Sequence, residues 1–488
     1  MAEQASLASR ASESLPTNPK RSMTAFVNDI HSGLNLTKVA AVTEVDSIEA
    51  IQSSVRAAGA RGGAIAIAGG RHSMGGQQFV TGGTLLDTRP MKRVLRFDRE
   101  RGLVEVEAGI QWRDLVDFLI VSQDGPAPQW GMGQKQTGAD RFSIGGSVSS
   151  NCHGRGLTMP PIVSDVEAIR LVRPDASVIE CSRNQNPELF RLAIGGYGLF
   201  GVIYSVTLRL APRQKLERVV EMTTVPELAV AFAKRIADGF LYGDLQFSID
   251  PASADFLHAG VFSCYRPVDS ETPIPSNQRG LSREDWQMLL WLAHTGKARA
   301  FEEYSRHYLA TSGQVYWSDL HQLADYTDGY HEELDRTLGA KDPASEMISE
   351  VYVPRARLAD FMAAVADDFR SHGVDVVYGT IRLIRRDEDT FLPWAKDDYA
   401  CVIFNLHTVH TEEGIAHAAA AFRRLIDLAI ERNGNYFLTY HRWATREQVE
   451  RCYPEFADFL RQKRSHDADE LFQSDWYRHY ATLFADEL

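Results

Sequence analysis

The chain has 488 residues, of which 44% are hydrophobic and 24% charged, a composition typical of globular proteins rather than of disordered or fibrous ones. A single hydrophobic core stops growing at roughly 250–300 residues, so two or three lobes are expected. The net charge of −13 disfavours nucleic acid or an anionic membrane surface as the main partner, because both attract clustered Lys and Arg.

The cysteines argue against a disulfide framework. Their number is odd, and no two of them form a C-x-x-C pair, so no zinc knuckle is predicted either. The first twenty residues lack the apolar core of a secretory signal, and no stretch reaches the roughly 20 apolar residues of a spanning helix. We therefore expect a cytoplasmic protein without a membrane span.

In chain order, residues 1–32 are expected to form a polar N-terminal tail. A strand at Val39–Val42 follows, then a helix opened by a capping box at residues 46–49, then a buried strand at Ala64–Ala68. Further strands are expected at Thr84–Asp87, Leu103–Glu107, Val166–Val172, Val178–Cys181 and Val202–Leu210, and short helices after Trp112 and over Pro187–Ile194.

Pro212 and the charged stretch after it predict a domain boundary. Beyond it, residues 281–336 are rich in Trp, Tyr, His and acidic residues and suit helices with aromatic faces. Apolar stripes at helical spacing occur within residues 358–369 and 422–429, and two strand-like runs lie between them, at Val374–Ile384 and Tyr399–Leu406. This mixture predicts an α+β lobe that covers the first domain.

Two glycine-rich loops are the most informative motifs, Gly69–Gln77 and Ser143–Gly154. Small residues let backbone N–H groups approach an anion closely, as a dinucleotide's pyrophosphate requires. The first loop follows a predicted strand and offers an imidazole, His72. A third run, Gly196–Gly201, matches G-x-G-x-x-G. It follows a helix and precedes a strand, the reverse of the Rossmann order, so we reject it as a nicotinamide site.

On these loops the chain resembles the vanillyl-alcohol-oxidase-type (PCMH-type) flavoprotein superfamily. The resemblance implies an α+β fold with a two-part FAD-binding domain at residues 33–213, an α+β substrate or cap domain at 214–430, and a C-terminal segment at 431–488 that returns to the flavin. It implies FAD as the cofactor. The implied cofactor-binding residues are Gly69, Gly70, Arg71, His72, Ser73, Met74, Gln77, Gly138, Ser143, Ile144, Gly145, Gly146, Ser150, Asn151, Cys152, His153, Gly154 and Ile203.

The resemblance also bears on how the flavin is held. In sugar-alcohol oxidases and cytokinin dehydrogenases a histidine that matches His72 is bonded covalently to the flavin 8α position, so His72 is implied as a tether. The alternative is a noncovalent flavin that His72 merely lines.

The C-terminal part resembles decaprenylphosphoryl-ribose oxidases through Tyr453-Pro454 and the residues that follow. Those enzymes carry a lysine at Tyr440, a glutamine at Glu350 and a lysine at Arg382, so a different substrate is implied. Tyr440 and His441 are the leading candidates for the base. A histidine titrates near neutral pH, whereas a tyrosine needs its pKa lowered by a cation such as Arg382. Glu350 is expected to orient substrate hydroxyls, and Arg382 to hold negative charge on the flavin or on the substrate.

These residues predict an FAD-dependent oxidoreductase that oxidises a hydroxyl group of a small polar substrate, a sugar, polyol, lactone or related alcohol, by hydride transfer to flavin N5. Electrons then pass to oxygen or to another acceptor. The alternatives are a flavin-dependent reductase of a C=C bond and a non-catalytic flavin-binding redox protein. His407 and His410 lack a third ligand in the sequence, so no metal is expected.

Overall fold

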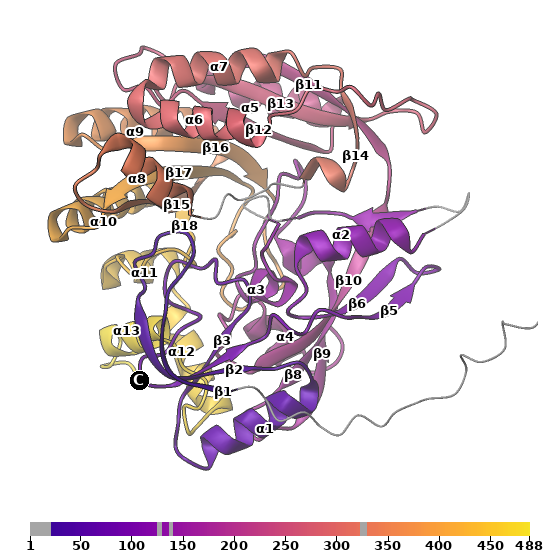
Figure 1. Cartoon of the computed structure of the whole chain (residues 1–488), viewed down its shortest axis with the longest axis vertical. Helices are drawn as coiled ribbons and strands as arrows, with labels where there is room; N and C mark the ends of the chain where they lie inside the picture. Colours follow the sequence, from indigo (N-terminus) through magenta and orange to yellow (C-terminus); the bar gives the residue numbers. More distant parts are fainter. Residues whose placement is uncertain (1–20, 124–128, 136–139, 323–328) are drawn as a thin grey trace, which may run out of the picture.

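The computed structural model describes residues 21–123, 129–135, 140–322 and 329–488. The strands of these residues form three sheets with helices packed on them, so the fold is α+β as predicted. The two smaller sheets lie in the lower half of Figure 1, and the eight-stranded sheet lies above them.

The first sheet carries the first glycine loop. Its strand order is β1-β2-β4-β3, with β1 antiparallel to β2 and the other neighbours parallel. Helix α1 begins after Ser47, whose side chain accepts from the Ala50 N–H; Ser47 therefore caps the helix alone, and the predicted capping box does not form, because Ala50 has no side-chain acceptor to return the bond. The bounds are β1 Arg21–Val27, β2 Thr37–Glu44, α1 Ile48–Gly59, β3 Ile65–Ala68 and β4 Thr84–Asp87.

The second sheet has the order β5-β6-β10-β8-β9, with β7 paired to the end of β10. The hairpin predicted over residues 166–181 is β8 and β9, and the predicted strand at 202–210 lies within β10. The bounds are β5 Val94–Asp98, β6 Leu103–Glu107, α2 Trp112–Val121, β7 Trp130–Met132, α3 Ile144–Ser149, η1 Ile162–Asp165, β8 Val166–Val172, β9 Val178–Ser182, α4 Pro187–Ala193 and β10 Val202–Pro212.

The third sheet is antiparallel, with the order β14-β11-β13-β12-β16-β17-β15-β18. Helices α5, α9 and α10 pack on it, and the two predicted apolar stripes are the buried sides of α9 and α10. The bounds are β11 Lys215–Thr224, α5 Val225–Ala237, β12 Tyr242–Phe247, β13 Ala259–Pro267, α6 Arg283–Thr295, α7 Lys297–Leu309, β14 Val315–Trp317, η2 Leu320–Gln322, α8 Tyr330–Leu338, β15 Ala344–Pro354, η3 Arg355–Arg357, α9 Leu358–His372, β16 Val376–Ile384, β17 Tyr399–Val409, α10 Glu412–Ile430 and β18 Asn435–Tyr436.

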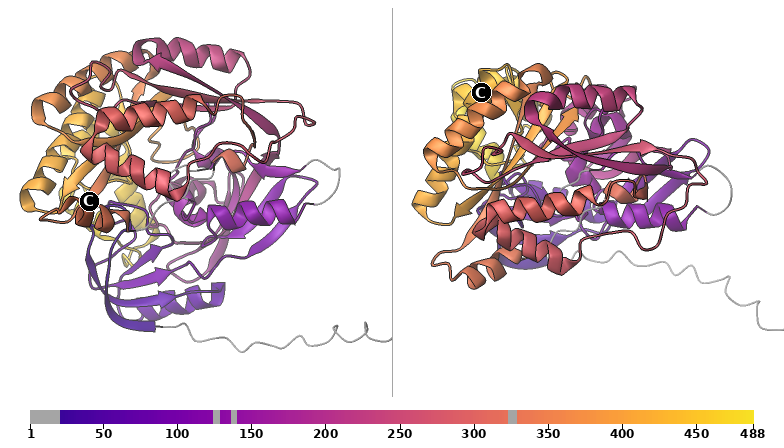
Figure 2. Two further views of the ribbon diagram at one scale, coloured as in Figure 1. Left: turned by 45° about the horizontal axis from the view of Figure 1, so that its top comes forward. Right: turned by 90° about the horizontal axis from the view of Figure 1, so that it is seen from above.

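The C-terminal segment leaves this sheet and returns to the first one. Helices α11 (Arg446–Cys452), α12 (Phe456–His466) and α13 (Asp475–Leu483) lie beside the N-terminal strands, as the yellow and indigo ribbons of Figures 1 and 2 show. The Ile65 N–H donates to the Leu471 carbonyl at 2.8 Å, and Ile65 and Phe472 form a parallel bridge. The chain therefore closes on the strand that leads into the first glycine loop.

Residues 21–32, which were predicted to belong to a polar tail, are part of the folded structure. Residues 21–27 form β1, and Asp29, His31 and Ser32 are buried. The Asp29 carboxylate explains the burial, because it accepts from the backbone N–H groups of His31 and Ser32 and from the Ser32 hydroxyl. The polar composition of this segment predicted a tail, because composition does not show that a single side chain holds a turn.

No helix within the described ranges is both long enough and apolar enough to cross a lipid bilayer.

A buried ion pair fastens the C-terminal segment. Lys463 Nζ lies 2.6 Å from Asp467 Oδ2, both side chains are at most 1% exposed, and the same carboxylate accepts from the backbone N–H groups of Leu471 and Phe472. Asp467→Ala leaves a buried ammonium without its partner, and we expect the free energy of unfolding to fall by about 3–5 kcal/mol.

Chemical denaturation measures this loss. Asp458→Ala is the matched control, because Asp458 and Arg461 form an exposed pair, whose removal costs about 1 kcal/mol or less. Equal losses in the two variants would show that the buried pair does not hold the segment.

Candidate active site

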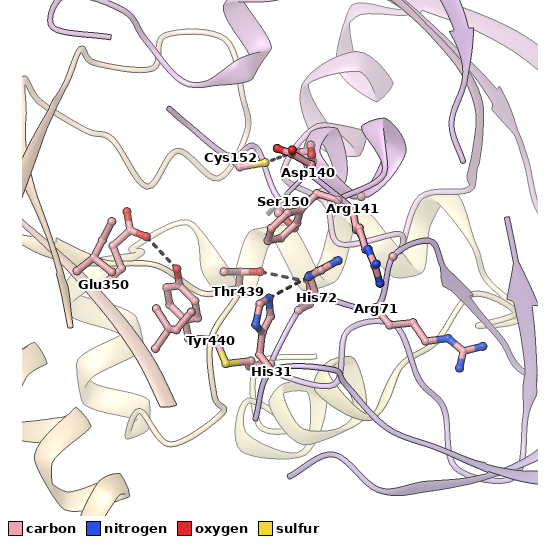
Figure 3. A pocket seen from close by; sticks show the side chains of 18 of the residues that line it. His31, Arg71, His72, Asp140, Arg141, Ser150, Cys152, Glu350, Thr439 and Tyr440 are labelled. Atoms are coloured by element: carbon pink, nitrogen blue, oxygen red, sulfur yellow. Dashed lines mark hydrogen bonds between the residues drawn. The ribbon is translucent and has the colours of Figure 1, made fainter. Parts of the chain in front are cut away.

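A cavity of about 970 Å³ lies between the two glycine loops and one face of the eight-stranded sheet. Both loops, the turn before α11 and strands of the third sheet contribute to its wall. Figure 3 shows the loop residues on one side and Glu350 with Tyr440 on the other. Residues that are far apart in the sequence therefore meet in one chamber, of the size that proteins use for cofactors and substrates.

The first loop starts where β3 ends. Ile65, Ala66 and Ala68 are buried and fix the strand, so the chain emerges at the edge of the sheet. Arg71 has φ +61, a left-handed conformation that non-glycine residues rarely adopt. An ion pair of 3.1 Å between Arg71 and Asp87, the last residue of β4, stabilises this conformation.

The second loop is held against β6 and α2. The N–H of Gly145 donates to the Ala108 carbonyl at 2.7 Å, and the Trp112 indole donates to the Ser147 hydroxyl at 3.0 Å. Ser143 caps α3 by accepting from the Gly146 N–H. The loop therefore presents its backbone to the cavity in one defined conformation.

The two loops approach so closely that only glycine fits. A Cβ on Gly69 would lie 2.0 Å from the Ser143 hydroxyl oxygen, and one on Gly70 would lie 2.4 Å from the Arg141 carbonyl. Two buried polar atoms in or beside the first loop, Arg71 Nε and Gln78 Oε1, have no hydrogen-bond partner among the described residues. A dense backbone cradle with unsatisfied polar atoms fits the pyrophosphate and ribityl groups of a dinucleotide such as FAD.

His72 is buried in this cradle. Its Nδ1 lies 2.9 Å from Nε2 of His31, and its ring stacks on Phe142 with 4.0 Å between the centroids. Burial, reinforced by His31, lowers the pKa of His72 well below its usual value. The imidazole is therefore neutral at pH 7, the form that acts as a nucleophile.

On the opposite wall, Glu350 is central to a buried hydrogen-bond chain. The Tyr440 hydroxyl donates to Glu350 Oε2 at 3.0 Å, and His153 Nε2 lies 2.5 Å from Oε1. Glu350 projects from β15, and its carbonyl accepts from the Phe437 N–H, which sets the turn that carries Tyr440.

The charges around this chain assign its proton states. Burial opposes ionisation of Glu350, but His153 and Arg382 outweigh it and lower the pKa of this carboxyl below its usual 4.5. Burial and the Glu350 charge raise the pKa of Tyr440 well above 10. Glu350 is therefore an anion and Tyr440 a hydrogen-bond donor, so the expectation that a cation lowers the pKa of Tyr440 does not fit the structure.

Arg382 completes this wall. It projects from β16, is 6% exposed and lines the cavity. Its Nε has no hydrogen-bond partner among the described residues. A buried guanidinium with an unused donor is suited to hold negative charge that a ligand brings.

Most predicted site residues line the cavity. Those that do are Gly69, Gly70, Arg71, His72, Ser73, Met74, Gln77, Ser143, Gly145, Gly146, Ser150, Cys152, Ile203, Glu350, Arg382 and Tyr440. Burial raises the pKa of Cys152 to about 12, so this thiol stays protonated. Gly138 lies outside the described residues.

Five predicted residues are not among those that line the cavity. Ile144 belongs to the core, Asn151 bonds Asp387, and Gly154 packs against the Lys135 carbonyl. His153 lies behind Glu350, and thus one layer from the cavity.

His441 points elsewhere. It lines a smaller cavity, stacks on Trp443 and lies 3.3 Å from the Ser32 hydroxyl. Burial lowers its pKa to about 3. Tyr440 lines the large cavity and His441 the smaller one, so the geometry favours the Glu350–Tyr440 wall over His441.

Sequence reasoning missed other parts of the wall. His31 belongs to the assumed tail, and Thr439 precedes a predicted residue. Tyr197 and Gly198 lie in the glycine run that was rejected as a nicotinamide site, yet they line the cavity. Gly198 has φ +77 and Tyr197 φ +53, so a glycine-rich run between a helix and a strand was a usable signal for a tight turn at the site.

His407 and His410 do not act together. His410 bonds Ser345, whereas His407 lies with His294 and Asp375 in a group whose ligand-type atoms are within 4.8 Å of one another. Lys297 Nζ lies 2.8 Å from the Asp375 carboxylate and already neutralises it, so we assign no metal to this group.

Comparison with known proteins supports the interpretation of the two glycine loops as a cofactor cradle. The family described as "FAD binding domain" matches residues 39–182, which include both glycine loops. L-galactono-1,4-lactone dehydrogenase, mitochondrial, from Brassica oleracea is 35% identical over 139 residues, 28% of this chain and 22% of that protein. L-gulonolactone oxidase from Mus musculus is 31% identical over 165 residues, 34% of this chain and 36% of that protein.

A longer match is more distant. Cytokinin dehydrogenase 2 from Arabidopsis thaliana is 25% identical over 348 residues, 65% of this chain and 64% of that protein. These matches thus span from about a fifth to less than two thirds of the relatives' own length. The backbone cradle fits a dinucleotide, and residues 39–182, which carry both loops, match an FAD-binding domain; over parts of its length the chain is similar to PCMH-type FAD-dependent oxidoreductases.

Proposed function

We propose that the protein is an FAD-dependent oxidoreductase that oxidises a hydroxyl group of a small polar substrate, a sugar, polyol, lactone or related alcohol. Two of the similar proteins are named for lactones, one as a dehydrogenase and one as an oxidase. The proposal leaves the electron acceptor open between oxygen, which an oxidase uses, and another oxidant, which a dehydrogenase uses.

One observation carries the proposal. An ionised carboxylate, Glu350, lines the same cavity as the two glycine loops and accepts a hydrogen bond from Tyr440. Oxidation of an alcohol needs a group that takes the hydroxyl proton beside the place where hydride leaves carbon. Glu350 is the described residue that best meets this need, in preference to Tyr440 and His441, which the sequence favoured.

The FAD would be held by the first loop through Gly69–Gln77 and by the second loop through Ser143–Cys152. When bound, it supplies the hydride acceptor, the N5 atom of its ring. The backbone of both loops would cradle the phosphates, and Arg71 would contribute its unused Nε donor.

The protein's own residues supply the proton chemistry. Glu350 Oε2 takes the proton of the substrate hydroxyl, and Tyr440, which stays protonated, donates to that oxygen and holds its orientation. His153 fixes the other oxygen from behind and is a positioning residue. Arg382 lines the cavity with an Nε donor that no described residue accepts from, and it would stabilise negative charge that develops during the reaction.

A covalent flavin link through His72 is part of the proposal. It is supported by the neutral state of the imidazole, by its place on the cavity wall and by the contact with His31, which orients the ring. We also propose a cytoplasmic location, supported by five cysteines that are all buried and unpaired, as a reducing compartment favours.

An anaerobic screen tests the function. The FAD-loaded full chain is mixed with sugars, polyols and lactones without oxygen, and the visible flavin absorbance is followed. We expect at least one hydroxylated compound to bleach the flavin, and NADPH to leave it unchanged. Rapid bleaching by NADPH would instead support a reductase of C=C bonds, and a flavin that no compound bleaches would contradict the enzyme.

Replacing the proposed base tests the chemistry. Glu350→Gln keeps the shape but cannot accept a proton, so kcat/KM is expected to fall by about 10²–10⁴-fold while FAD content is retained. The pKa of Glu350 is lowered, so the carboxylate is ionised at every pH above the usual range for carboxyl groups, and wild-type kcat/KM is expected to stay constant there. As the pH falls through the lowered pKa, Glu350 is protonated and kcat/KM is lost. The variant is expected to lack this acid limb.

Two variants serve as controls in the same assay. His441→Gln changes the other candidate base, and Glu284→Gln removes an exposed carboxylate of α6; both are expected to keep wild-type kcat/KM. A large loss in His441→Gln with full activity in Glu350→Gln would reverse the assignment.

Denaturation tests the tether. We expect the flavin to stay with the acid-precipitated chain and to fluoresce in a denaturing gel, and His72→Ala to release it because the nitrogen nucleophile is gone. His258→Ala, at an exposed histidine of the cap, is expected to keep the label. Flavin that washes freely from the wild-type chain would refute the covalent link but not FAD binding.

A further inference from the structure

The part of the cavity beyond Arg382 has a polar sheet as its floor. The strand register places Leu245 of β12 opposite Ile381 of β16, and Asp244 of β12 opposite Ser263 of β13. Side chains opposite one another share a face, so the face that carries Arg382 continues through Asp244 and Ser263. Helices α6 and α7 contribute Trp286, Tyr304 and Tyr308 to the same chamber.

Two guanidinium groups line this region, and only one of them lies near a carboxylate among the described residues. Arg155 Nη1 lies 3.9 Å from Asp244 Oδ1, the nearest carboxylate oxygen to either group among the described residues. Arg218, from β11, has no ion pair in the described part of the chain. It bonds the Tyr265 hydroxyl and the Thr311 hydroxyl. One positive charge is therefore left without a counter-charge among the described residues.

Aromatic rings surround Arg218 on several sides. Its guanidinium carbon lies 5.1–5.3 Å from the ring centroids of Tyr265, Tyr308 and Tyr316. Burial opposes the charge of Arg218, but these tyrosines and the hydrogen bond to the Tyr265 hydroxyl outweigh burial and raise the pKa of Arg218 above its usual value. Arg218 thus stays a cation in the chamber.

Several buried polar atoms of the same chamber have no hydrogen-bond partner among the described residues. They include Arg155 Nε, Gln246 Oε1, Ser263 Oγ and both ring nitrogens of His321. All four residues line the cavity, and His321 is 8% exposed. Burial and the two arginines lower the pKa of His321 well below its usual value, so it adds no positive charge. Such atoms cost free energy unless a ligand or water meets them.

The other carboxylates among the described residues that line the cavity lie too far away to neutralise the charges of Arg155 and Arg218. Glu346 and Glu350 are on β15, which β16 and β17 separate from β12, and Asp140 belongs to the segment before the second loop. Arg283, at the start of α6, adds a further cation to the wall. Counted over the described residues, the β11–β13–β12 end of the chamber therefore carries an excess of positive charge.

We propose that the substrate carries an anionic group, a carboxylate or a phosphate, that Arg155 and Arg218 bind while the hydroxyl to be oxidised lies at Glu350. This inference rests on the proposed function. Adjacent strands are about 4.8 Å apart, so β15 lies about 14 Å from β12, which carries Asp244, and about 24 Å from β11, which carries Arg218. The anionic group is therefore several atoms away from the reacting carbon, which excludes simple 2-hydroxy acids and favours acids or phosphates of sugars and polyols.

Calorimetry on the FAD-loaded full chain tests the anion site with three matched probes, glucitol, gluconate and glucitol 6-phosphate. We expect at least one anionic probe to bind about tenfold or more tightly than glucitol, and the tighter one identifies the anionic group. Arg218→Met is expected to abolish this preference and to leave the affinity for glucitol unchanged. Lactate is expected to bind no better than glucitol.

Arg155→Met provides a second, independent variant if Arg218→Met is unstable. Arg266→Met is the matched control, because Arg266 lies on β13 but pairs with Glu217 and is half exposed. Equal affinities for glucitol and both anions, no detectable binding of either anion, or a preference that survives in both cavity variants would overturn the proposal.

The two proposals fail differently. If neutral alcohols or lactones bleach the flavin and anions bind no better, the oxidoreductase stands and the anion site falls. If anions bind in an arginine-dependent way but no hydroxylated compound bleaches the flavin, the anion site stands and the oxidation falls.

Discussion

The close approach of the two glycine loops is the constraint on which the rest of the site depends. Gly69 and Ser143 come so near that a single added methyl group would collide with the serine hydroxyl. This contact joins the first sheet to the second, because one loop leaves β3 and the other is anchored on β6 and α2. A cofactor cradle made of backbone from two sheets needs both sheets to be in place before it exists.

The C-terminal segment completes the cradle from a third direction. Gln77 of the first loop donates to the Leu438 carbonyl, and a Cβ on Gly75 would lie 2.5 Å from the Tyr440 carbonyl. The turn that carries Tyr440 is thereby fixed to the cofactor side. The same turn is fixed to the cap, because the Phe437 N–H donates to the Glu350 carbonyl. One short segment therefore sets the distance between the cradle and the proposed base.

The strand register of the eight-stranded sheet positions the side chains on the substrate side of the cavity. Glu350, Arg382 and Asp244 lie on three different strands, and antiparallel pairing through β17 and β16 brings them to one face. At one end of this face the Glu350 carboxylate accepts hydrogen bonds, and at the other end Arg155 lies near Asp244 while Arg218 has no ion pair among the described residues. The two ends of the chamber therefore differ in charge, and we propose that one end accepts the proton while the other binds the anionic group.

The sequence by itself determined the parts that depend on local patterns. Glycine-rich runs beside strand-like residues identified both loops as an anion cradle, and their resemblance to a flavoprotein superfamily implied FAD. Periodicity located β8, β9, α9, α10, β16 and β17, since these signals lie within a few residues of one another. Glu350 and Arg382 were singled out by resemblance.

Tertiary structure alone decided their roles. Burial and the Glu350 charge keep Tyr440 protonated, a turn directs His441 away from the cavity, and Arg218 enters it from a strand that no motif marked. Proton states and charge balance depend on groups hundreds of residues apart, and their distances are set only when the three sheets pack.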